Sequence, residues 1–133
     1  MRYAVTSGET ASMATMQASD HDGVLVAVIT GELDMISVDG VGTALFEHLA
    51  KRPDGMVVEL AVEFMGSSAL SMLLELHGRA QREEVEFAIV ATAVAAARPL
   101  MASALTQVLP VAPSVDEAVK SMQEKRKPSQ QLS

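Results

Sequence analysis

Apolar residues gather into short dense runs along the chain, separated by longer segments in which they recur every three or four positions. The dense runs are rich in β-branched residues or bounded by turn residues, as buried strands are. They lie at residues 24–30 (VLVAVIT), 56–60 (MVVEL) and 86–91 (EFAIVA). A weaker alternation over residues 13–17 predicts an edge strand, and residues 107–111 predict a short further strand.

The segments with helical spacing predict four helices. In the first, apolar residues recur from Val41 to Leu49, and Ser37 is the candidate N-cap. The other three are expected at about residues 68–82, 95–105 and 114–123. In the helix at 95–105, Leu100, Met101 and Ala104 are expected on the apolar side.

Strands and helices therefore alternate along most of the chain. This alternation predicts an α/β fold, a single domain with a mostly parallel mixed sheet of about four to five strands and about four helices covering it. We expect the domain to span residues 13–123. A flexible N-terminus is expected at residues 1–12, and a flexible basic C-terminal tail at residues 124–133.

The composition is that of a globular protein, with 49% apolar residues in a chain of 133. The absence of cysteine excludes disulfides, zinc-thiolate sites and thiol nucleophiles. No apolar run approaches the roughly 18 residues of a membrane span, and the first residues lack the apolar stretch of a secretory signal. We therefore expect a cytoplasmic protein without stable membrane insertion.

Charge is distributed unevenly along the chain. Residues 1–119 hold six Lys and Arg against sixteen Asp and Glu, whereas residues 120–133 hold four against one. An acidic body repels the phosphate backbone, so we expect no nucleic-acid partner. Together with the sparse aromatic residues, the acidity favours a monomer or a weak dimer.

Motifs for catalysis and cofactor binding are missing from the sequence. It contains no glycine-rich phosphate loop and no nucleophile elbow. The histidines His21, His48 and His77 fall in a turn and on two different predicted helices, without a second ligand at metal-site spacing. We therefore expect no catalytic residue, no metal site and no cofactor.

Two adjacent serines, Ser67 and Ser68, follow Gly66 between a predicted strand and a predicted helix. One of them is expected to cap the helix through its hydroxyl oxygen. The same position favours a phosphoryl group, because free N–H groups and the helix dipole stabilise an anion there. A docked partner would then face a desolvated dianion, so the turn is a candidate switch.

Four segments together resemble the STAS domain, and more narrowly the small stand-alone bacterial anti-sigma factor antagonists. They read GELD (residues 31–34), MVVEL (56–60), FMGSSALSMLL (64–74) and LPVAPSVDEAV (109–119), and the resemblance spans roughly residues 13–122. It implies that Ser68 is phosphorylated by a partner that is both anti-sigma factor and serine kinase, with Ser67 as the second candidate. It implies partner contacts at Gly31, Glu32, Asp34, Gly66, Ser67, Ser68 and Ala69.

The chain departs from the family pattern at two positions next to the serines. Gly66 stands where the family has an aspartate, and Ala69 stands where it has a glycine. The first change removes a carboxylate beside the phosphoacceptor, and the second stiffens the first helical turn. Both changes bear on phosphorylation more than on the fold.

Two other functions stay open from the sequence. In the first, a STAS module that is not phosphorylated binds a nucleotide or another anion through the backbone N–H groups of Gly66–Ala69. In the second, the chain is a peripheral subunit of a membrane transport assembly, which the basic tail would suit.

Overall fold

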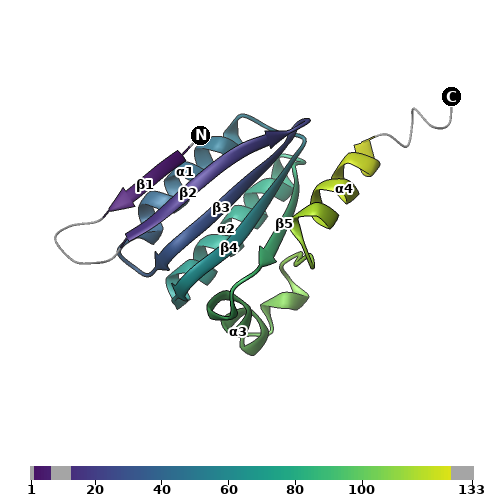
Figure 1. Ribbon diagram of the computed structural model, residues 1–133. Helices are drawn as coiled ribbons and strands as arrows, with labels where there is room; N and C mark the ends of the chain where they lie inside the picture. The colour runs from purple at the N-terminus through teal and green to yellow at the C-terminus, as the bar shows by residue number, and fades with distance from the viewer. Residues whose placement is uncertain (1, 7–12, 127–133) are drawn as a thin grey trace, which may run out of the picture.

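The computed structural model describes residues 2–6 and 13–126. Figure 1 shows a single sheet with helices packed against it. The elements, in chain order, are β1 (Arg2–Thr6), β2 (Met13–His21), β3 (Val24–Leu33), α1 (Val38–Ala50), β4 (Gly55–Met65), α2 (Ser67–Arg82), β5 (Glu86–Ala91), α3 (Val94–Ala102), η1 (Leu105–Gln107) and α4 (Val115–Arg126).

The five strands lie in the sheet in their sequence order, β1-β2-β3-β4-β5. β1, β2 and β3 pair antiparallel, whereas β3, β4 and β5 pair parallel. Each parallel step requires a crossover, which α1 and α2 provide. The expected α/β fold with a mixed sheet is therefore confirmed.

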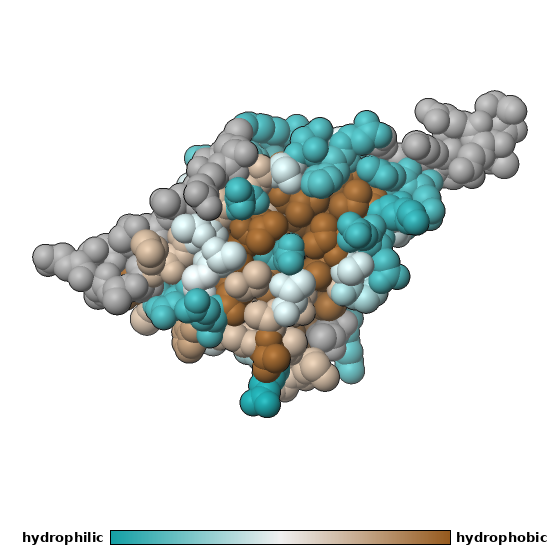
Figure 2. All heavy atoms as spheres, in the orientation of Figure 1, coloured by the Kyte–Doolittle hydropathy of each residue, from teal (hydrophilic) through white to brown (hydrophobic). Residues whose placement is uncertain are grey.

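The main core lies between the sheet and helices α1 and α2, which run side by side behind it (Figure 1). Inward side chains of the strands alternate as a two-residue period requires, so that Ala27 and Ile29 face these helices while Val26 faces the other side. On that other side α4 covers part of the sheet through Ala118 and Met122. Figure 2 shows hydrophobic side chains gathered over the centre of this face, within a hydrophilic rim.

The start of the chain differs from the prediction. We expected no regular structure before Met13, but residues 2–6 form β1 and pair antiparallel with β2 from Arg2↔Gln17 to Thr6↔Met13. An edge strand is held mainly by the backbone bonds of one neighbour, so its own side chains need not show a strong pattern. Residues 7–12 lie outside the described part of the chain.

The strand predicted at residues 107–111 is wrong. η1 ends at Gln107, and only Val111 forms a bridge, to Ile89 of β5. Two backbone hydrogen bonds hold it, from Ile89 N to Pro110 O and from Ala112 N to Ile89 O. Prolines at 110 and 113 lack the N–H that a longer ladder needs, so the pairing stops at one residue.

The last two helices also differ from the expected bounds. α3 ends at Ala102, and Ala104 adopts a left-handed conformation with φ of 59°. Leu100 lies on the buried side as expected, together with Ala96, but Met101 is 72% exposed and Ala104 is also exposed. α4 continues to Arg126, three residues past the predicted end at Gln123. The rest of the predicted tail, residues 127–133, lies outside the described residues.

Candidate functional site

The two segments singled out in the sequence meet at one end of the sheet. β3 and β4 are parallel neighbours, so the segments that follow them lie at the same edge. The backbone N–H of Gly66 donates a hydrogen bond of 2.9 Å to the carbonyl of Leu33. The structure thus places residues 31–34, which the family resemblance grouped with the serines, beside the serine turn.

Gly31 is required by the backbone geometry at this edge. Its φ is +93°, and the register with β4 shifts between Gly31 and Glu32. A Cβ atom on Gly31 would lie 2.5 Å from the carbonyl oxygen of Met13. The extra residue of this bulge is Glu63 of β4, because Gly31 pairs with Val62 and Glu32 pairs with Phe64. β3 keeps its alternation, with Glu32 exposed and Leu33 buried.

Asp34 organises the loop that follows β3. One carboxylate oxygen, Oδ1, accepts hydrogen bonds from the N–H of Ile36 at 3.0 Å and of Ser37 at 2.9 Å. Ser37 occupies the predicted N-cap position of α1, but its hydroxyl does not cap the helix: it donates to Glu32 O at 2.6 Å and accepts from Asp34 N at 3.2 Å. Ser37 is fully buried, so this hydroxyl fixes the loop from inside.

The start of α2 differs from the predicted cap. Gly66 occupies the N-cap with φ of −93° and ψ of 178°, and no side chain caps the helix. Ser67 and Ser68 are its first two residues, so their backbone N–H groups precede the first intrahelical bonds. Both serine hydroxyls are therefore left available, and the N–H groups form an electropositive end.

The predicted contact residues differ in exposure. Ser67 is exposed, and Gly66 and Ser68 are half-buried. Ala69 is fully buried in the core, so its side chain is not exposed for the partner contact that the resemblance implied. Its position follows from the helix: Ala69 faces the sheet while Ser68 faces the neighbouring helix α1.

Three exposed apolar residues flank the serine turn and were not singled out in the sequence. Met35 is 73% exposed, Ile36 is 40% and Phe64 is 50%. Phe64 follows the exposed Glu63, so the strict alternation of β4 fails there. Two apolar residues directly after Asp34, outside any strand or helix, were the sequence signal for this surface. Such a group of exposed apolar residues is typical of a protein-binding surface.

A groove of about 650 Å³ runs between α1 and α2 and begins at the serine turn. Ser68 and Ser71 line it from α2, and Asp39 lines it from the first turn of α1. Gly42 lets the two helices approach, since a Cβ there would lie 3.2 Å from Met72 Cγ. Ser68 is therefore shared by the sheet edge and this groove.

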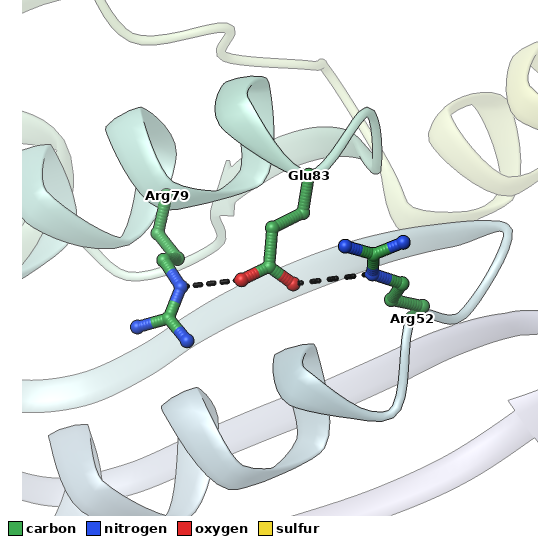
Figure 3. Close-up of polar contacts among 3 residues, drawn as sticks. All are labelled: Arg52, Arg79 and Glu83. Carbon is green, nitrogen blue, oxygen red and sulfur yellow. Dashed lines mark hydrogen bonds and ion pairs between the residues drawn. The ribbon is translucent and has the colours of Figure 1, made fainter.

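An ion-pair network includes Arg79, which lines the far end of the groove. In Figure 3 the side chains of Arg79 and Arg52 point toward the carboxylate of Glu83 from two different segments. Arg79 Nε lies 2.5 Å from one oxygen, and Arg52 Nε lies 3.8 Å from the other. The hydrogen bond from Arg79 lowers the pKa of Glu83 below its ordinary value. The network links the end of α2 to the segment that follows α1.

Two kinds of feature are absent from the described residues. No helix within residues 13–126 is long and apolar enough to cross a membrane. The same part of the chain holds no group of three or more His, Asp or Glu that could bind a metal ion.

Comparison with known proteins identifies relatives over most of the chain. A family model described as the STAS domain matches residues 15–118. The protein named anti-sigma-F factor antagonist RsfB, from two strains of Mycobacterium tuberculosis, is 36% identical over 87 residues. The match covers 65% of this chain and 70% of that relative.

Solved structures share the fold. An anti-sigma factor antagonist from Mycobacterium paratuberculosis superposes with a TM-score of 0.77 at 32% identity, covering 83% of this chain and 94% of that one. RsbS from Moorella thermoacetica superposes with a TM-score of 0.68 at 16% identity, covering 84% and 97%. The anti-sigma factor antagonist SpoIIAA, in its unphosphorylated form, gives 0.68 at 15% identity, covering 82% and 96%.

Proposed function

The chain belongs to the STAS domain family, and from this membership we propose that it is an anti-sigma factor antagonist. It binds an anti-sigma factor that is also a serine kinase, and phosphorylation of Ser68 ends the binding. The protein acts by binding, without catalysis of its own. The names of its relatives from two mycobacteria support the role.

The observation that carries the proposal is the surroundings of Ser68. Its hydroxyl lies at the second position of α2, beside the loop that Asp34 organises. Apolar side chains of Met35, Ile36 and Phe64 are exposed around the same edge. An uncharged hydroxyl among apolar side chains suits burial under a partner.

Phosphorylation of Ser68 would reverse this preference. A phosphoserine has about −1.5 to −2 charges at neutral pH, and burying it without a cationic partner costs desolvation free energy. Within the free protein the N–H groups at the start of α2 stabilise the same charge. Gly66 adds no carboxylate next to it. The modification is thus tolerated by the free protein and opposed in the complex.

The test is the intact mass of the protein isolated from its own cells in several growth states. We expect an added phosphate that is present in wild type and in Ser67→Ala but absent in Ser68→Ala. Absence of the modification in every growth state would contradict the proposal. A phosphate that persists in Ser68→Ala and is lost in Ser67→Ala would move the switch to the neighbouring serine.

A second candidate function is direct binding of a nucleotide or another anion. The uncapped start of α2, with Gly66 at the N-cap, favours it, because no side-chain oxygen occupies the N–H groups. Thermal stabilisation by phosphate or a nucleotide, lost in Gly66→Asp, would support this function. Unchanged melting at millimolar ligand would exclude it.

A further inference from the structure

The groove between α1 and α2 continues well beyond the serine turn. Ser68 lines one end and Arg79 lines the other, and the two residues lie on the same helix. At 1.5 Å per residue this separation is about 16 Å, or three helical turns. The groove is therefore long enough to hold a short helical segment of another protein.

The walls of the groove offer apolar contact along its whole length. Val38 lies near the serine end, Met72 and Phe46 lie along the middle, and Ala50 lies toward the far end. Met72 is 8% exposed and Phe46 is half-buried, so both present part of their surface to the groove. Apolar positions spaced by about one turn are what an amphipathic helix recognises.

The rim of the groove is negatively charged. Asp39, Glu47 and Glu75 line it and are exposed, and none forms a salt bridge to any of the residues that the structure describes. Arg79 is the one cation among the described lining residues, and Glu83 already binds it. The rim therefore presents carboxylates that a partner can neutralise.

We propose that this groove binds a basic amphipathic helix of the protein partner, with apolar side chains against Met72 and Phe46 and Lys or Arg side chains against the rim. The inference rests on the proposed function for the identity of the partner. Nucleic acid and anionic membrane surfaces are repelled by the same carboxylates. A helix with apolar residues at i, i+3 or i+4, and i+7 fits the length of the groove, and basic residues beside them fit the negative charge of its rim.

The position of Ser68 links this groove to the proposed switch. Its hydroxyl lines the groove, so a phosphoryl group there would occupy the end of the space that the bound helix fills. A partner helix would have to leave that end or bury a dianion. Glu47 and Glu75 lie further along the groove, so their substitution tests the groove without altering the phosphorylation site.

The experiment uses two synthetic amphipathic peptides of the same length, one of Leu and Lys and one of Leu and Glu. Each is titrated into the ¹⁵N-labelled full chain, and backbone chemical shifts are recorded. We expect saturable shifts from the Leu/Lys peptide in α1 and α2 along the groove, and at least tenfold weaker binding of the Leu/Glu peptide. Glu47→Lys and Glu75→Lys should each lower the affinity for the Leu/Lys peptide at least threefold.

The control is Glu124→Lys, an equal charge reversal on the exposed surface of α4. It should change the affinity less than twofold. The proposal would be overturned if the chemical shifts map away from the groove. It would also be overturned if Glu47→Lys, Glu75→Lys and Glu124→Lys lower the affinity for the Leu/Lys peptide equally. The mass measurement on Ser68 is independent: groove binding without a phosphate contradicts only the phosphorylation switch, and a phosphate without groove binding contradicts only the groove.

Discussion

Gly66 occupies the N-cap of α2, where the family resemblance implies an aspartate. Its backbone is extended, and a Cβ there would lie 3.4 Å from a ring carbon of Phe64, an ordinary contact. Aspartate therefore fits, and its carboxylate can accept the free N–H of Ser68. We predict that Gly66→Asp stabilises the protein by about 0.5 kcal/mol in urea unfolding. Gly66→Ala, which adds the Cβ without an acceptor, should be no more stable than wild type. Equal gains in stability from both substitutions would show that capping does not cause the effect.

Gly31, unlike Gly66, occupies a position at which a side chain destabilises the fold. Its positive φ and the 2.5 Å approach of Met13 O oppose any side chain. We predict that Gly31→Ala lowers the free energy of unfolding by about 2 kcal/mol. Gly78 within α2 is the control, since its Cβ would only meet the end of Arg82 at 3.8 Å. Gly78→Ala should stabilise by about 0.5 kcal/mol, and loss of stability in both variants would contradict the argument.

At the scale of one helix, α1 contains a buried titratable group. His48 is 7% exposed, and burial, with a smaller contribution from Lys51, lowers its pKa below the ordinary value of about 6.5. The unfolded chain therefore takes up the proton first as the pH falls, so stability is lost below about pH 6.5 and regained above it. We predict that His48→Gln shows a smaller loss of unfolding free energy than wild type between pH 7.5 and 5.5. Equal losses would assign the pH dependence to other groups.

Among the elements, buried strands were predictable and their irregular ends were not. Residues 24–30 and 56–60 were recognised because burial on both faces requires continuous apolar runs. The family resemblance grouped residues 31–34 with the serine turn as partner contacts, and the parallel strands β3 and β4, which end at one edge, bring the two segments together. The hydrogen bonds of Asp34 and Ser37 could not be foreseen, because they depend on the bulge at Gly31 and on its contact with β2. The local pattern of apolar residues predicts strands and helices, whereas these hydrogen bonds depend on segments that are distant in the sequence coming together in the fold.

At the scale of the whole molecule, the sheet is covered unequally. Helices α1, α2 and α3 contribute to the core on one face, while α4 is the one described helix that packs on the other, against Val26, Val57 and Val90. α4 is also tied at its end, where Gln123 Nε2 donates to His21 O at 3.1 Å and Lys125 Nζ lies 3.1 Å from Glu86 Oε1. Both tying side chains lie at the surface, where such bonds contribute little. The apolar contacts must therefore hold α4 in place.

Met122 is the test of that conclusion. It is 5% exposed, and its sulfur lies so close to Gly55 that a Cβ there would be 2.5 Å away. Removing this side chain leaves a cavity between α4 and the sheet, so we predict that Met122→Ala costs about 2–4 kcal/mol in unfolding free energy. Met101→Ala is the matched control, because that methionine is 72% exposed and should change stability by less than about 0.5 kcal/mol. If both variants unfold at the same urea concentration as wild type, α4 does not contribute to the cooperative core.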